Sequence, residues 1–191
     1  MKQLKENQKN EGLTLVGERI YLRGFVAADA EAISSISNQP EVSQFLPDWK
    51  SSKEDRLNWI VNYEMPSNQA FLEAVSEKVD MEGHFLKMSI LLKDTDELIG
   101  WCCTGMKGEL PLPNREVMYA VSYPFQNKGY ATEASTLLID YLFNDTTIET
   151  LNAIALIHNS GSNQVIKKCG FEFKETIEID GEIFNRYRLN N

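Results

Sequence analysis

The chain has 191 residues, of which 42% are hydrophobic and 25% charged, with a net charge of -9 at pH 7. A chain of this length suits one domain that buries roughly 70% of its unfolded surface, and no apolar run approaches the roughly 20 residues of a membrane span. The negative charge disfavours nucleic acid as a partner and favours cationic substrates such as amines.

The beginning of the chain and its cysteines limit where the protein works. Residues 1–12 are polar and charged and lack the apolar core of a signal segment, so we expect a flexible tail, a cytoplasmic location and a single domain over residues 13–191. Cys102, Cys103 and Cys169 do not have the spacing of metal ligands. We interpret them as reduced core residues and expect no metal site.

Local patterns in the first part of the chain predict a strand followed by two helices. Residues 19–23 alternate charged and bulky side chains like a half-buried strand, and Asp29 is placed to cap a helix over residues 30–37. Apolar residues at helical spacing predict a second helix over about 54–63. Residues 65–83 carry mixed signals, with a proline followed by a charged stretch that suits either a strand or a helical turn.

The rest of the chain is rich in strand patterns. Two β-rich runs at residues 85–93 and 98–106 are separated by a polar turn and predict an antiparallel hairpin. Further strands are predicted over 117–121, 151–157, 171–179 and 182–189, and helices over 131–143 and 159–169. Because helices and strands mix without a linker or repeat, one mixed-sheet domain is the economical interpretation.

The segment between residue 121 and the following helix has the geometry of an anion-binding loop. A helix start presents free backbone N–H groups and a partial positive charge, both of which attract phosphate. Gly129 allows close approach of a ligand, and Asn127 tolerates left-handed backbone angles. Neither common nucleotide-binding glycine pattern occurs here. Such a loop alone is more often a plain connection than a binding site, so it needs further support.

A family resemblance supplies that support. Residues 126–134, with the sequence QNKGYATEA, resemble the coenzyme A pyrophosphate loop of the GNAT acetyltransferase superfamily, whose pattern is Gln/Arg-x-x-Gly-x-Gly/Ala. Asn159, Ser162 and the pair Gly170-Phe171 resemble the second signature of that family. Asn127 departs from the pattern, because many members carry glycine there.

The resemblance covers about residues 13–189. Residues 18–23 resemble the first strand, and residues 98–101 the third, of the RimJ/RimL-type branch that acetylates ribosomal-protein N-termini. The family implies an α+β fold, with a mostly antiparallel central sheet of about seven strands flanked by about four helices. It also implies acetyl-CoA as cosubstrate, and dimers are common in it, so a homodimer is compatible with the resemblance.

The same resemblance points to the residues that hold the cosubstrate. It places the pyrophosphate on the loop, pairs the pantetheine arm with the preceding strand, and adds contacts from the next helix. Carried over to this sequence, the residues that contact coenzyme A are Val121, Tyr123, Gln126, Asn127, Lys128, Gly129, Tyr130, Ala131, Thr132, Asn159 and Ser162. Asn159 also suits the N-cap of a helix, and both roles are compatible.

The chemistry requires a base, because an amine must be neutral to attack a thioester and its pKa is about 8 to 10.4. Glu116 matches a position where many members place a carboxylate, and partial burial would raise its pKa toward neutrality. The alternative is a solvated carboxylate paired with Arg115. A backbone N–H near Val121 could stabilise the oxyanion.

The acid that protonates the leaving thiolate is less clear. Many relatives use a tyrosine on the last helix, and this sequence has Ile166 there. Ser162 or Tyr119 could substitute, or the thiolate could leave unassisted, since a thiol pKa near 8.5 makes it a fair leaving group. For Tyr119, packing is the alternative role. In the family, the region of Trp49 and Trp59 shapes the acceptor cleft.

The resulting hypothesis is an N-acetyltransferase that moves an acetyl group from acetyl-CoA to a primary amine by direct attack through a tetrahedral intermediate. The acceptor is a protein N-terminal α-amine or a small-molecule amine, and neither nucleic acid nor a membrane is expected as a partner. A non-catalytic coenzyme A-binding or sensing module of the same fold is the alternative, and a plain scaffold is a third reading.

Overall fold

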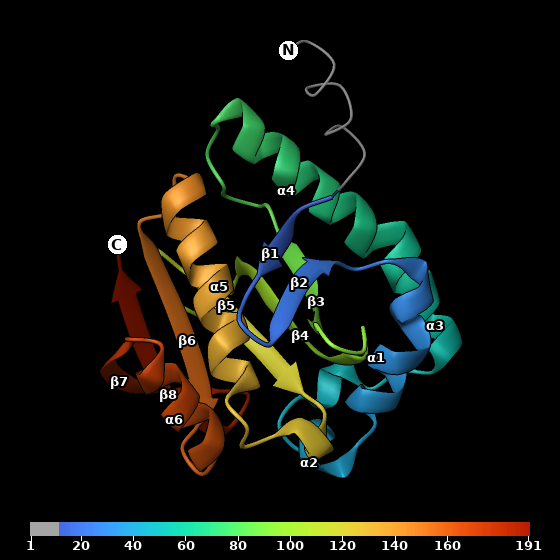
Figure 1. Cartoon of the computed structure of the whole chain (residues 1–191). Coiled ribbons are helices and arrows are strands. Elements are labelled where there is room, and N and C mark those ends of the chain that lie inside the picture. Colours follow the sequence, from blue (N-terminus) through green and yellow to red (C-terminus); the bar gives the residue numbers. More distant parts are fainter. Residues whose placement is uncertain (1–11) are drawn as a thin grey trace.

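The structure is a computed structural model that describes residues 12–191, so most of the expected N-terminal tail lies outside the described residues. Eight strands form one sheet in the order β1-β2-β3-β4-β5-β6-β8-β7 (Figure 1). Among these strands, every neighbouring pair is antiparallel except β5 and β6. The strands are β1 (Thr14–Val16), β2 (Ile20–Gly24), β3 (Leu86–Leu92), β4 (Leu98–Met106), β5 (Arg115–Val121), β6 (Thr150–Leu156), β7 (Glu172–Ile179) and β8 (Glu182–Asn190).

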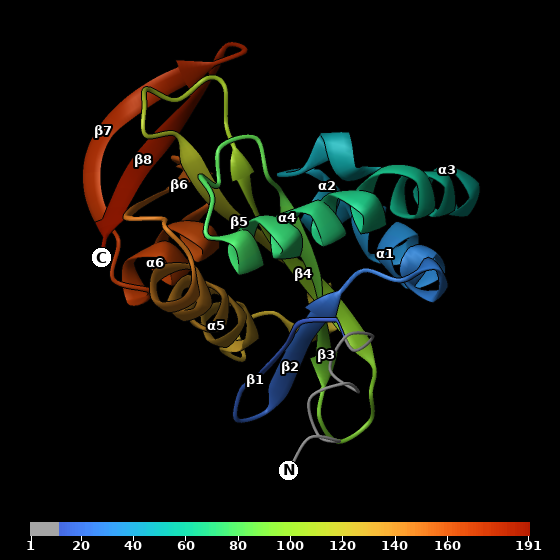
Figure 2. The same ribbon diagram turned by 90° about the horizontal axis from the view of Figure 1, so that it is seen from above.

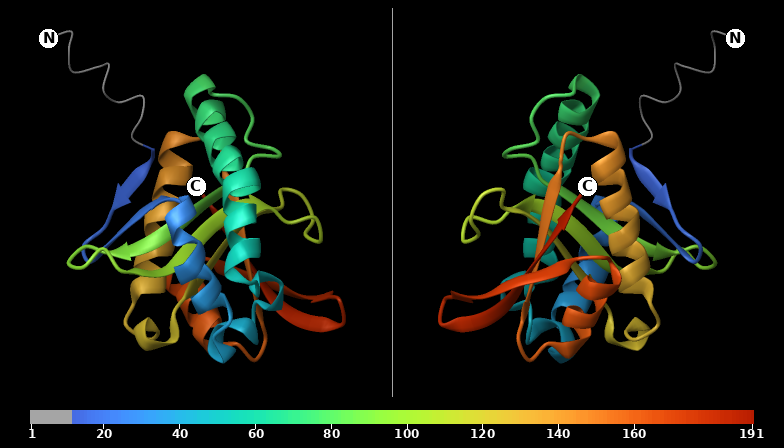
Figure 3. Two further views of the ribbon diagram at one scale, coloured as in Figure 1. Left: turned by 90° about the vertical axis from the view of Figure 1, so that its right-hand side faces the viewer. Right: turned by 90° about the vertical axis from the view of Figure 1, so that its left-hand side faces the viewer.

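Helices cover both faces of this sheet. Figure 2 shows α5 and α6 on one side and α1, α2 and α3 on the other, while the β7–β8 hairpin extends away from the helices (Figure 3). No helix within residues 12–191 combines the length and apolar character needed to cross a membrane. The helices are α1 (Ala30–Ser37), α2 (Pro40–Ser43), α3 (Lys53–Trp59), α4 (Met65–Glu77), α5 (Tyr130–Asp145) and α6 (Ser160–Lys168).

Two apolar cores lie on opposite faces of the same strands. On the α5 face, Cys102 and Leu138 belong to a large buried cluster. On the α1 face, Cys103, Trp101 and Ile33 belong to a smaller one. Adjacent residues of a strand point to opposite faces, so the neighbouring cysteines enter different cores. Both are fully buried free thiols, as expected for structural cysteines.

Two elements differ from the sequence prediction. The sheet has one strand more than expected, β1, which pairs with β2. At three residues, β1 is too short to show an alternating pattern in the sequence. The ambiguous region after residue 65 is the helix α4, joined to α3 by a π-helical segment, Ile60–Glu64. Pro66 lies in the first turn of α4, where its missing N–H is tolerated. That proline made a continuous helix look unfavourable in the sequence.

The predicted cap of the first helix was wrong in its detail. Asp29 directly precedes α1, but its carboxylate makes no capping hydrogen bond to that helix. It instead accepts hydrogen bonds from Arg23 at 2.7 and 2.8 Å, from the Ser89 hydroxyl at 2.7 Å and from the Val26 amide at 3.0 Å. This buried carboxylate therefore connects β2, β3 and the start of α1, and it does not cap the N–H groups of the helix.

The parallel strands β5 and β6 separate almost at once. In the described part of the chain they share one registered pair, Glu116 with Asn152, whereas β5 stays paired with β4 as far as Val121. The Ser122 amide donates to Ile99 of β4. Because backbone groups alternate in direction, those of Tyr119 and Val121 point toward the gap between β5 and β6. The sheet thus has an open strand edge near its centre.

Candidate active site

The loop that follows β5 wraps the start of α5. A short 3₁₀ turn, Tyr123–Phe125, leads into residues 126–129, and Tyr130 is the first residue of α5. Asn127 has a φ of 61° and Gly129 a φ of 86°, so both adopt left-handed angles. As expected, asparagine takes the place of a glycine here. Backbone that alternates in this way directs successive N–H groups into a concavity that suits an anion.

Side chains from distant parts of the chain hold this loop in place. Arg19 donates to the Lys128 carbonyl at 2.8 Å and forms an ion pair with Glu133 at 2.9 Å, and its guanidinium lies 4.6 Å from the centre of the Tyr130 ring. Gln126 donates to the Val121 carbonyl at 3.0 Å. These contacts occupy carbonyl groups of the loop region and leave its N–H groups for a ligand. Sequence reasoning missed Arg19 because its partners lie more than 100 residues away.

The start of α6 lies beside the gap between β5 and β6. The Asn159 side chain accepts a hydrogen bond from the Ser162 amide at 3.1 Å, so Asn159 is a helix N-cap. The Tyr119 hydroxyl donates to the Ser162 carbonyl at 3.2 Å. Burial raises the pKa of Tyr119. The structure therefore brings together Tyr119, Asn159 and Ser162 on the α5–α6 face.

Glu116 lies on the opposite face. It lines a cavity of about 140 Å³, the Glu116 cavity, whose wall includes Trp49, Lys87, Cys103 and Met118. Burial raises the pKa of Glu116 to about 7, with smaller influences from nearby charged groups. A carboxyl group with this pKa can gain or lose a proton near neutral pH.

The alternative pairing of Glu116 with its neighbour was wrong. Arg115 is buried and donates to the carbonyls of Met81 and His84. Adjacent residues on a strand point to opposite faces, so the Arg115 guanidinium cannot follow the Glu116 side chain into its cavity. Glu116 is therefore not a solvated carboxylate balanced by that arginine.

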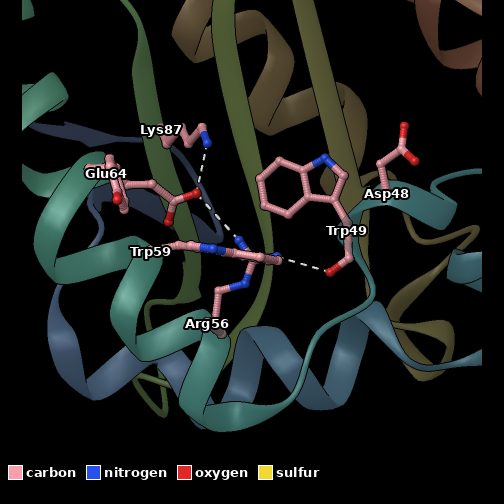
Figure 4. Close-up of a pocket in the computed structure, with 7 residues that line it drawn as sticks. Asp48, Trp49, Arg56, Trp59, Glu64 and Lys87 are labelled. Carbon is pink, nitrogen blue, oxygen red and sulfur yellow. Dashed lines mark hydrogen bonds and ion pairs between the residues drawn. The ribbon is translucent and has the colours of Figure 1, made fainter.

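A second, larger cavity adjoins the first. This tryptophan cavity has a volume of about 290 Å³ and is lined by Trp49, Trp59, Arg56, Glu64 and Lys87, together with two outer residues (Figure 4). It shares Trp49 and Lys87 with the Glu116 cavity. Trp49 and Trp59, which were expected to shape an acceptor cleft, both line this cavity. Trp101, the third tryptophan, is fully buried in the core.

Three charged side chains form a cluster at the base of the tryptophan cavity, which we call the charged triad. Glu64 accepts hydrogen bonds from Lys87 at 2.7 Å and from Arg56 at 3.3 Å. The Arg56 guanidinium lies 4.9 Å from the ring centres of both Trp49 and Trp59. Sequence reasoning missed the triad, because Arg56 and Glu64 lie on one helix and Lys87 on a strand 23 residues further on.

The arrangement places two kinds of site on opposite faces of an opened sheet. The anion-binding loop and Tyr119 lie on the α5–α6 side, and the ionisable Glu116 lies in a cavity on the other. Such a gap lets two substrates meet, one from each face. Among residues 12–191, no group of three or more His, Cys, Asp and Glu side chains is arranged to hold a metal ion. The fold and the site suit a group-transfer enzyme with a phosphate-bearing donor.

Comparison with known proteins identifies the family. Residues 19–172 match the acetyltransferase (GNAT) domain, and the chain therefore belongs to the GNAT family. It is an acetyl-CoA-dependent N-acetyltransferase. The chain is 26% identical over 169 residues to the uncharacterized N-acetyltransferase p20 of Bacillus licheniformis, and the match covers 88% of this chain and 87% of p20.

Solved structures share the fold. A GNAT-family acetyltransferase from Bacillus anthracis superposes with a TM-score of 0.73 at 19% identity, over 93% of this chain and 98% of the other. RimL, a ribosomal L7/L12 alpha-N-protein acetyltransferase in complex with coenzyme A, superposes with a TM-score of 0.71 at 15% identity, over 93% of this chain and 98% of RimL. At these identities, the two superpositions show a shared fold.

Proposed function

We propose that this enzyme acetylates a primary amine, with acetyl-CoA held at the α5 loop and the β5–β6 gap, and with Glu116 as the general base. The acceptor is a protein N-terminal α-amine or the amine of a small molecule, and it enters from the Glu116 cavity. The observation that carries the proposal is the position of Glu116, whose pKa is about 7, across the opened sheet from the anion-binding loop.

The residues of the loop fit a pyrophosphate. Gly129 has a left-handed φ, and a side chain added there would lie 3.2 Å from the Arg19 guanidinium, so the loop is tight and has no Cβ on its inner turn. The N–H groups of residues 127–131 would bind the phosphates, and the open edge at Val121 would pair with the extended arm of coenzyme A. Asn159 and Ser162 would contact it from α6. When bound, acetyl-CoA supplies the acetyl group as an activated thioester.

Glu116 supplies the proton acceptor. An α-amino group has a pKa of about 8 and a lysine amine one of about 10.4, so the attacking amine has a proton to lose at neutral pH. A carboxylate with an ordinary pKa near 4.3 is too weak a base for this, whereas a pKa of about 7 brings Glu116 within range of the amine.

Tyr119 is the candidate acid on the other face. Its hydroxyl lies at α6, oriented by the Ser162 carbonyl. A tyrosine in this position can donate a hydrogen bond to a sulfur atom that enters through the gap. Burial raises the pKa of Tyr119, so full proton transfer to a thiolate is unfavourable. Because a thiol has a pKa near 8.5, the thiolate is a fair leaving group with this hydrogen bond alone and takes its proton from solvent.

Two measurements test the proposal. Isothermal titration with acetyl-CoA should show binding, and a thiol-release assay with a panel of amines and N-terminal peptides should show turnover above hydrolysis. Glu116→Gln should lower kcat/KM by about 10²-fold or more, the usual contribution of a general base, while acetyl-CoA still binds. Binding without turnover for any amine, or an unchanged rate in the variant, would contradict the proposed role.

A further inference from the structure

We propose that the acceptor carries a carboxylate several bonds from its amine, as in a short peptide, and that Lys87 binds this carboxylate. The inference rests on the proposed function, since it takes the Glu116 cavity as the place of the reacting amine. It adds the chemical class of the acceptor and the residue that selects it.

Lys87 has hydrogen-bonding capacity to spare. An ammonium group offers three donors, and among the described residues its one hydrogen-bond partner is Glu64. Its side chain is 31% exposed and lines both cavities. The ammonium group also lies 5.3 Å from the centre of the Trp49 ring. Its remaining N–H donors have no hydrogen-bond partner among the described residues, so a ligand in either cavity can accept from them.

The N–H groups of Arg56 are bonded within the protein, and they hold the triad in place. Its guanidinium donates to the Trp49 carbonyl at 2.9 Å, to the Ser51 hydroxyl at 3.3 Å and to Glu64. It is buried, with a side chain only 3% exposed. Arg56 thus positions Glu64, Glu64 positions Lys87, and Lys87 is the member of the triad that a ligand can reach.

The charge balance favours an anion. Two cations surround one carboxylate, so the charged triad has a net charge of +1. Asp48 also lines the cavity, but its carboxylate is turned away from the triad in Figure 4 and its side chain is exposed to solvent. The positive charge that remains on the triad favours a ligand carboxylate beside Lys87 over a second ammonium group.

The spacing between Lys87 and Glu116 gives the size of the acceptor. Lys87 lies in one row with Cys103 and Met118 across three strands, and Glu116 follows two residues from Met118 on the same face. With strands about 4.8 Å apart and a rise of about 3.3 Å per residue, the Cα atoms of Lys87 and Glu116 are about 12 Å apart. Side chains stand roughly perpendicular to a sheet, so we take the two charged groups to be about as far apart as their Cα atoms. Hydrogen bonds of about 3 Å at each end then leave roughly 6 Å for the acceptor. The two termini of an extended dipeptide lie about that far apart.

Matched acceptors test the inference. Glycylglycine and glycylglycinamide differ only in the carboxylate, and each is assayed at a pH that gives the same fraction of neutral amine. The wild-type enzyme should prefer glycylglycine by about tenfold in kcat/KM, mainly through a lower KM. Lys87→Gln should bring this ratio to about one, and Lys87→Arg should keep most of it. Because each ratio is taken within one variant, a general loss of activity cancels.

Lys53→Gln is the matched control. Lys53 also pairs with a glutamate, Glu31 at 2.6 Å, but on the outer surface of α3, so this variant should keep the wild-type ratio. Equal rates for the two acceptors in the wild-type enzyme would overturn the inference and leave the proposed function standing. So would a preference that survives in Lys87→Gln. If no amine were acetylated, the proposed function itself would fail.

Discussion

Glu116 and Tyr119 are three residues apart on β5, and this odd spacing sends their side chains to opposite faces of the sheet. The face of Glu116 holds its cavity, and the face of Tyr119 holds α6. A base and an acid from one strand can thus serve two substrates that approach from different sides. At the scale of single residues, the alternation of the strand separates the two roles proposed for Glu116 and Tyr119.

The raised pKa of Glu116 predicts a pH-dependent stability. Its folded pKa of about 7 lies above the unfolded value near 4.3, so the native state binds the proton more tightly. The contribution of Glu116 to the free energy of unfolding should therefore fall as pH rises from about 4 to 7 and then level off. Glu116→Gln should be more stable than the wild type by about 2 kcal/mol at pH 8 and about equal at pH 4. Urea unfolding at several pH values measures this difference.

A control separates this effect from a general loss of acidic charge. Glu178→Gln changes an exposed residue of β7 and should keep the wild-type dependence on pH. If Glu116→Gln and the wild type gave parallel stability curves from pH 4 to 8, the carboxyl group would not have the raised pKa assigned to it.

Some residues of the candidate site could be identified from the sequence, and others could not. Glu116 could be predicted because its place at the start of a strand is a local feature that matches a family position. Lys87, Glu64 and Arg56 could not, because a strand pattern does not show which helix covers a given face. Arg19 was seen as a strand residue, and its contact with the loop depends on how β2 and α5 pack together.

At the scale of elements, the loop before α5 depends on two left-handed residues. Gly129→Ala should lower stability by about 1 kcal/mol, because alanine strains at a φ of 86° and its Cβ presses on Arg19. The KM for acetyl-CoA should rise several-fold, and the KM for the amine should stay unchanged. Steady-state kinetics with each substrate varied in turn, with thermal unfolding, measures both effects.

Gly108→Ala is the matched control for this change. Gly108 does not have a left-handed φ, and an added Cβ there would meet nothing within 4 Å. The control should leave both KM values and the stability near those of the wild type. An unaltered KM for acetyl-CoA in Gly129→Ala would remove the loop from its proposed role.

Helices and strands with a long, regular pattern could be predicted from the sequence. Elements with irregular backbone geometry could not. The β3–β4 hairpin and α5 follow clear strand and helix periods. The helix from α3 to α4 contains a π-helical segment, in which the Met65 amide bonds to Ile60 five residues back. This extra residue per turn breaks the helical period and precedes Pro66, so the local signals disagreed.

At the scale of the molecule, both apolar cores are built on the same strands. Because β4 supplies Cys102 to one core and Cys103 to the other, we propose that residues 13–191 are a single domain and predict that they unfold as one unit. Fluorescence of Trp49, Trp59 and Trp101 reports on the α1–α3 face, and far-UV circular dichroism reports on all elements. The two urea transitions should coincide.

A shortened chain extends this test to the N-terminus. A protein that begins at Leu13 should keep the midpoint of the full chain, because the described sheet starts at Thr14. Separate transitions for the two probes, or a clearly lower urea midpoint in the shortened chain, would show that the unit is not residues 13–191 alone.

The open edge between β5 and β6 would make the stability of the folded protein depend on whether coenzyme A is bound. A strand edge inside a sheet is a template for pairing with other chains, and a ligand arm that pairs with β5 would cover it. Any ligand that binds only the native state stabilises it by mass action, by about 2.7 kcal/mol at a concentration one hundred times its Kd. The fraction of folded enzyme would then rise and fall with the concentration of coenzyme A. Acetyl-CoA would thus protect from unfolding the enzyme that consumes it.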